Sequence, residues 1–149
     1  MSLDDWARNG WLRRHRTTAK ELEGLLSIVA RELRDSGVKG LSADGRFTHA
    51  YRAALTLGTV LLYASGYAPA RGQSHHYRTI EALTQVLGKS ASDDTAYLQS
   101  CRAKRNAAEY DGANEATDTE AGELAEFARA LERRVLQWLT ERPTSGQID

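Results

Sequence analysis

One predicted helix carries a group of polar side chains that is suited to bind an anion. The segment YLQSCRAKRNAAEYDG covers residues 97–112, and its polar group comprises Arg102, Arg105, Asn106, Glu109 and Tyr110. Arg105 stands in helical register with Leu98 and Cys101, so it continues a stripe that begins as apolar. Because a buried arginine without a partner is costly, we expect Arg105 to meet a protein carboxylate, a second subunit or a ligand phosphate.

Phosphate is an acceptor that suits the chemistry of arginine. The guanidinium is planar, presents its N–H donors as a fork and stays charged at any physiological pH. The spacing also permits a purely structural network, because Arg105 precedes Glu109 by four residues and Arg102 precedes Asn106 by four. The acidic stretch 109–126 is a further source of carboxylates, either within the chain or toward a partner. Both interpretations stay open from spacing alone.

The segment SHHYRTIEAL contains a second group of candidate residues, His75 and His76. Adjacent residues on a helix point about 100° apart, so this pair cannot bind one metal ion from a regular helix. The simplest interpretation is a polar cluster near the start of a helix, with His76 or Tyr77 packed on a neighbour. Alternatively, His76 contacts a phosphate or a base, because helix N-termini favour anions.

Several signatures of cofactor chemistry are absent from the sequence. It contains no GxxxxGK[ST], no GxGxxG, no HExxH and no paired CxxC. The turn segments SADGRF and DGANEATD do not have the spacing of a calcium loop. The sequence therefore predicts neither a nucleotide cofactor nor a metal site.

Composition predicts a cytoplasmic protein with one folded domain. The chain has 149 residues, zero formal net charge and a single cysteine, Cys101, which excludes an intrachain disulfide and fits a reducing compartment. The N-terminus lacks the pattern of a signal peptide, and the longest apolar stretch, AALTLGTVLLYASGY, is too short to span a bilayer. Residues 1–92 hold 13 Lys/Arg against 8 Asp/Glu, whereas residues 93–149 hold 7 against 12. These halves either complement each other within the fold or guide an anionic ligand to one side.

Nearly every segment has the hydrophobic period of a helix. Thr18 with Glu21 and Thr117 with Glu120 form capping boxes, and Ser74 and Ser92 are candidate N-caps. The helices that start at Thr18, Ser74, Ser92 and Thr117 are expected to end near Gly37, Gly88, the Asp111-Gly112 pair and Arg142. We expect Gly37 to be a left-handed cap. A further apolar helix is expected to span about 46–65. No segment shows the alternation of a strand, and GYAPARGQS is expected to be a loop.

These elements predict an all-α fold. We expect an antiparallel bundle of four to five main helices with a short N-terminal helix, in one domain over residues 1–142 and a flexible tail over 143–149. The helix at about 46–65 is apolar over more than half its circumference, which is typical of the central helix of a bundle.

Three blocks in this order, LSADGRFTHAYRAAL, HHYRTIEAL and CRAKRNAAEYDG, resemble a bacterial subgroup of the HEPN superfamily over roughly residues 20 to 140. HEPN proteins are small helical bundles of prokaryotic toxin–antitoxin and defence systems, and many are metal-independent endoribonucleases. Their motif is an arginine, a polar residue, three further residues and a histidine, and two copies meet in the cleft of a homodimer. Arg105 and Asn106 match its first positions, and Tyr110 stands at the position of the histidine.

This replacement changes the chemistry that the resemblance implies. In the family motif, histidine can move a proton while arginine stabilises the charge of the phosphorane. Tyrosine has an ordinary pKa near 10, which makes it a poor base at neutral pH. Either Glu109 or His76 takes the place of that histidine, or the domain binds RNA without cleaving it.

The resemblance therefore leads to three hypotheses of function. The first is a homodimeric domain that binds nucleotide or RNA phosphate through Arg102, Arg105, Asn106 and His76, beside a nucleotidyltransferase-like protein partner. The second is an active endoribonuclease that uses Arg105, Tyr110 and Glu109 without a metal. The third, from another class, is a helical protein-interaction module whose arginines pair only with carboxylates.

Overall fold

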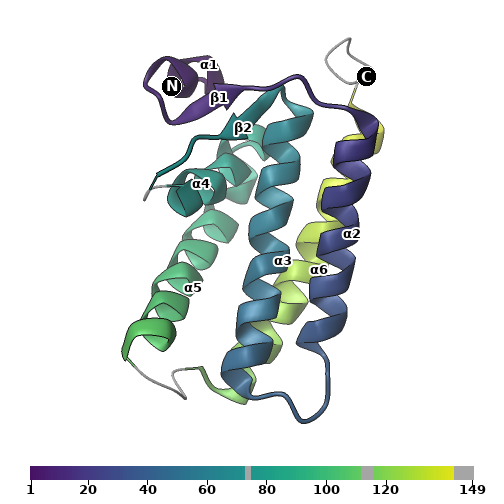
Figure 1. Cartoon of the computed structure of the whole chain (residues 1–149), viewed down its shortest axis with the longest axis vertical. Helices are drawn as coiled ribbons and strands as arrows, with labels where there is room; N and C mark the ends of the chain where they lie inside the picture. Colours follow the sequence, from purple (N-terminus) through teal and green to yellow (C-terminus); the bar gives the residue numbers. More distant parts are fainter. Residues whose placement is uncertain (73–74, 112–115, 143–149) are drawn as a thin grey trace.

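The fold is a bundle of helices with a small sheet at one end (Figure 1). The structure is a computed structural model that describes residues 1–72, 75–111 and 116–142, and the side chains of these residues apart from 107–111. The elements are α1 (Leu3–Arg8), β1 (Leu12–Arg14), α2 (Ala19–Ser36), α3 (Ala43–Ala64), β2 (Tyr67–Pro69), α4 (His75–Leu87), the short 3₁₀ helix η1 (Lys89–Ala91), α5 (Ser92–Asp111) and α6 (Asp118–Glu141). The predicted all-α class, with five main helices after a short first one, is confirmed.

Side chains just outside the helices fix where several of them begin. The Thr18 hydroxyl accepts a hydrogen bond from the Glu21 amide, and the Glu21 carboxylate accepts one from the Thr18 amide, as the predicted capping box requires. Thr117 and Glu120 form the same box at the start of α6. Helix α3 begins at Ala43, earlier than expected, because Ser42 caps it through the Gly45 amide.

Helix α3 is the centre of the bundle, and α2, α4, α5 and α6 all pack against it. Tyr51, Leu57 and Leu61 on α3 have no exposed surface, and the helix is apolar on most sides, as its sequence predicts. In Figure 1, α2 and α3 lie side by side in opposite directions, whereas α3 and α6 run in the same direction because α4 and α5 intervene in the chain. None of the described helices is both long and apolar enough to cross a membrane.

The two strands correct the expectation of a chain without strands. Leu12 pairs with Pro69 and Arg14 with Tyr67 in a short antiparallel sheet, so part of the expected loop GYAPARGQS is strand β2. Tyr67 is buried, and its hydroxyl donates a hydrogen bond to the Asp4 carboxylate. The pairing joins segments far apart in sequence, and strands of this length are too short to show an alternating pattern.

Arg78 of α4 holds the N-terminal segment against the bundle. Its guanidinium carbon lies 3.5 Å from the ring centroid of Trp11 and 5.5 Å from that of Trp6. The indole rings of Trp6 and Trp11 contact each other edge to face, with centroids 6.4 Å apart. Stacking a cation on indole faces attaches α1 and β1 to α4, and this supports the sheet.

Glycines at two helix positions have different roles. Gly37 ends α2 with φ −102°, so the expected left-handed cap is wrong, and its amide instead donates to carbonyls one turn back. Gly58 of α3 lies against α4, where an added Cβ would be 2.7 Å from the Thr79 carbonyl oxygen and 2.9 Å from Thr79 Cγ2. The close approach of α3 and α4 therefore requires glycine at position 58.

We predict that Gly58→Ala destabilises the protein by about 1–3 kcal/mol, because the methyl group would push α4 away from α3. Gly24→Ala is the matched control, since Gly24 is exposed on α2 and a Cβ there meets nothing within 4 Å. That substitution is expected to be neutral or to stabilise by up to about 1 kcal/mol. Urea unfolding followed by circular dichroism measures both, and equal effects of the two substitutions would contradict the close contact.

Candidate phosphate-binding site

Three helices meet at the buried ring of Tyr51. The Arg105 guanidinium carbon on α5 lies 5.4 Å from the Tyr51 ring centroid, within the range of a cation–π interaction. From α4, His76 Nδ1 lies 3.3 Å from the Tyr51 hydroxyl oxygen, at hydrogen-bond distance. We call Tyr51, His76 and Arg105 the Tyr51 cluster. It brings together residues that are distant in the sequence and that belong to two of the predicted site segments.

A second arginine is positioned beside an exposed aromatic ring on the same pair of helices, α4 and α5. Arg102 Nε donates a hydrogen bond of 2.9 Å to Gln99 Oε1, and the Arg102 guanidinium carbon lies 5.8 Å from the Tyr77 ring centroid. Gln99 Nε2 in turn donates to the Tyr77 carbonyl and to Glu81 Oε2. Tyr77 is 39% exposed, so its ring remains available to a ligand next to a cation.

The two histidines have different surroundings, as adjacent residues on a helix must. His76 contacts Tyr51, whereas His75 lines a shallow pocket together with Arg13, Arg71 and Tyr63. The His75 and His76 rings meet edge to face at 5.2 Å, so the pocket adjoins the Tyr51 cluster. Burial lowers the pKa of His75, and the positive charge of this pocket therefore comes from its arginines at neutral pH.

The predicted site residues divide into those that the structure brings together and those that it does not describe. Arg105 and His76 both contact Tyr51, Arg102 lies beside Tyr77, and Asn106 follows Arg105 on α5 with a half-buried side chain. The side chains of Glu109 and Tyr110 lie outside the described part, so their predicted catalytic roles stay predictions.

Sequence reasoning did not assign Tyr51 to the site. Its position in the apolar stripe of α3 indicates a core residue, and the structure confirms that it is fully buried. The sequence feature that could have indicated a polar contact at Tyr51 is its hydroxyl group, because a buried phenol nearly always requires a hydrogen-bond partner. The identity of that partner depends on how α4 docks, which no local pattern specifies.

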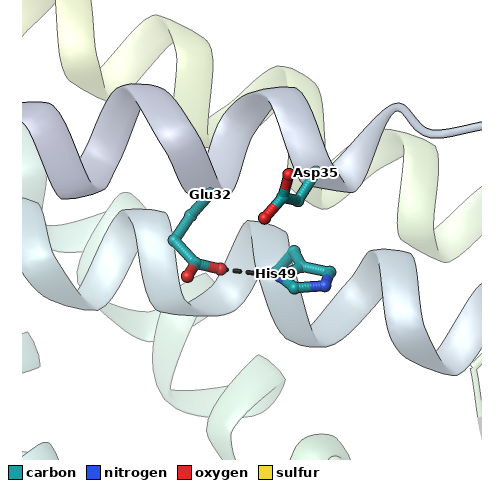
Figure 2. Close-up of side chains that lie close together, drawn as sticks. All are labelled: Glu32, Asp35 and His49. Carbon is teal, nitrogen blue, oxygen red and sulfur yellow. Dashed lines mark hydrogen bonds and ion pairs between the residues drawn. The ribbon is translucent and has the colours of Figure 1, made fainter.

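Another cluster of ionisable groups lies between α2 and α3 (Figure 2). Glu32 and Asp35 extend from α2 and His49 from α3, with His49 Nδ1 2.7 Å from Glu32 Oε2. The Glu32 side chain is 6% exposed, and Arg31 donates to its other oxygen at 3.2 Å. Burial opposes ionisation of Glu32, but the hydrogen bonds from His49 and Arg31 outweigh it and hold the pKa below its ordinary value. Glu32 is therefore a carboxylate at neutral pH.

Comparisons with protein-family models, with curated proteins and with solved structures gave no match.

Cys101 lies on the same helix as Arg102 and Arg105 but is not a nucleophile. It is 5% exposed, and burial raises the pKa of its thiol. Only the thiolate reacts rapidly with electrophiles, so a buried thiol with a raised pKa is inert. Cys101 is part of the core that supports the arginines.

We predict that Cys101 in the native protein reacts with Ellman's reagent at least about 100-fold more slowly than in guanidinium chloride near pH 8. Unfolding removes the burial that keeps the thiol protonated and inaccessible. Absorbance of the released thionitrobenzoate measures both rates, and Cys101→Ser provides the blank. Equally fast labelling of the native protein would contradict the buried position of this side chain.

Proposed function

We propose that this chain is a HEPN-like domain that binds nucleotide or RNA phosphate at the surface around Arg102, Arg105 and His76. The observation that carries the proposal is the convergence of Arg105 and His76, from two separate sequence blocks, on the ring of Tyr51. A shared contact with a rigid, buried side chain holds both groups in place before a ligand arrives, which lowers the entropy cost of binding.

The chemistry of the neighbouring residues supports the same ligand class. Arg102 and Arg105 carry planar donors for phosphate oxygens, and Asn106 adds an amide. Tyr77 offers an exposed ring on which a base can stack, with Arg102 beside it. A single-stranded RNA segment uses both kinds of contact, phosphate for affinity and base stacking for position.

The resemblance to HEPN proteins extends the proposal to assembly. It implies a homodimer in which two copies of the motif share one cleft, and a role in a toxin–antitoxin or defence pair with a nucleotidyltransferase-like partner. These elements rest on family analogy, and the phosphate-binding proposal stands independently of them.

A second candidate function, metal-independent RNA cleavage, is favoured by the position of His76. The family motif has a histidine where this sequence has Tyr110, so cleavage needs another group for proton transfer, and the sequence offers Glu109 and His76. His76 is held in the same cluster as Arg105, and this pairing supplies an imidazole for proton transfer beside a cation for charge stabilisation.

We predict that Arg105→Ala weakens binding of a fluorescein-labelled RNA of about ten nucleotides by at least about tenfold, because a phosphate contact is lost. Arg133→Ala is the matched control, since Arg133 is exposed on α6 and its loss removes the same charge. Fluorescence anisotropy across a salt series measures affinity, and the salt slope of Arg105→Ala is expected to fall by about 1. Equal affinity of Arg105→Ala and the wild type would refute the proposed site.

For the second candidate, we predict that the wild type cleaves total tRNA in EDTA and leaves 2′,3′-cyclic phosphate ends. His76→Ala and Arg105→Ala are each expected to lower the rate by at least about 100-fold, while Arg133→Ala retains it. Gel electrophoresis and end analysis measure the products. If tRNA stays intact while an active metal-independent endoribonuclease cuts it in a parallel tube, the second candidate function is refuted for this substrate.

A further inference from the structure

We infer that Glu32, Asp35 and His49 form a binding site for a divalent transition-metal ion of the Zn²⁺ class between α2 and α3. One ligand atom from each residue lies within 4.8 Å of the other two. Figure 2 shows both carboxylates and the imidazole gathered at the same place between the two helices. The inference concerns a separate part of the molecule and does not depend on the proposed RNA site.

The spacing along the chain explains why these donors converge. Glu32 and Asp35 are three residues apart on α2, so both project from one face of the helix toward α3. His49 on α3 faces them, whereas Tyr51, two residues later and about 200° around the helix, faces α4 and α5. The packing of α2 on α3 alone thus assembles the donor set.

Distances among the donors are close to those that a metal ion requires. With ligands at about 2.1 Å, the donor atoms of a tetrahedral ion are roughly 3.4 Å apart. Glu32 Oε2 and His49 Nδ1 are now 2.7 Å apart and joined by a hydrogen bond, and Asp35 lies within 4.8 Å of both. Small side-chain rotations would bring the three donors to this spacing without moving either helix, and any proton on His49 Nδ1 would pass to solvent as the metal ion binds.

The charges of the three proposed ligands match a divalent ion. The Asp35 side chain is half-buried and forms no hydrogen bond or ion pair with any residue in the described part of the chain, although its carboxylate lies beside that of Glu32. Arg31 binds Glu32 Oε1 from the solvent side and leaves Oε2 for the ion, and the charge of Arg52 acts on Glu32 from α3. Two carboxylates and a neutral imidazole then balance the charge of a divalent ion.

The donor types select the class of metal. Imidazole suits Zn²⁺, Co²⁺ and Ni²⁺, whereas Mg²⁺ and Ca²⁺ prefer oxygen ligands alone, and a thiolate for Cu⁺ is missing from the cluster. A ligand set of two carboxylates and one histidine leaves at least one coordination position for water or another ligand, unlike a closed structural site.

The test uses Zn²⁺ and Co²⁺ on protein that has been treated with EDTA and dialysed. Zn²⁺ is expected to raise the Tm of the wild type by roughly 5 °C or more at saturation, because the ion binds only the folded arrangement. Co²⁺ is expected to give visible d–d absorption, and titration of this band yields the Kd. Asp35→Asn and His49→Gln are each expected to weaken Co²⁺ binding at least about tenfold. The Asp35 side chain is half-exposed and has no partner in the described part of the chain, so its substitution leaves other contacts intact.

His15→Gln is the matched control. His15 Nε2 lies 2.9 Å from Glu21 Oε2, so His15 also forms a histidine–carboxylate pair. Among the described residues, no further metal ligand joins this pair to make a set of three. This variant should bind Co²⁺ as the wild type does. An unchanged Tm of the wild type in saturating Zn²⁺ would overturn the inference. So would Co²⁺ binding that survives both Asp35→Asn and His49→Gln, since the ion would then be held by other groups such as His75 and His76.

Discussion

The burial of α3 on nearly all sides is the constraint on which the rest of the structure depends. A helix in this position has to offer apolar or small residues in almost every direction, and the Gly58 contact with Thr79 illustrates how closely α4 approaches it. The few polar side chains that α3 directs at its neighbours must find partners on them, because unpaired polar groups in a core are costly. The polar contacts of α3 consequently fix which faces of α2, α4 and α5 meet it.

Tyr51 and His49 show this consequence on opposite sides of the same helix. The Tyr51 hydroxyl lies at hydrogen-bond distance from His76 on α4, and the Arg105 guanidinium from α5 lies over the Tyr51 ring. His49 finds Glu32 on α2. Each cluster is therefore a specific contact between helices.

Local patterns predicted the parts of the fold that depend on neighbouring residues. Residues within one or two turns determine the capping boxes at Thr18 and Thr117 and the apolar character of α3. All three predictions were confirmed. The pairing of Leu12–Arg14 with Tyr67–Pro69 was missed because it joins distant segments that are too short to show a period. The cluster of Glu32, Asp35 and His49 was missed for a related reason, since its members lie on different helices and resemble ordinary surface residues in sequence.

The distinction between local patterns and contacts of distant segments also applies to the charged residues. The basic excess of residues 1–92 and the acidic excess of residues 93–149 suggested that the halves neutralise each other or that the chain guides an anion. Among the ion pairs between described residues, only Arg46–Asp118 joins the two halves, whereas pairs such as Lys104–Glu120 and Arg134–Asp94 lie within one half.

Arg13 and Arg71, both from the basic half, instead line the pocket beside His75, next to the Tyr51 cluster. These two arginines give the pocket a positive field. A field of this kind attracts an anionic ligand before any contact forms and weakens steeply as salt screens it. The arrangement of charge thus supports the same ligand class as the arginines of α5, by an argument that does not depend on the family motif.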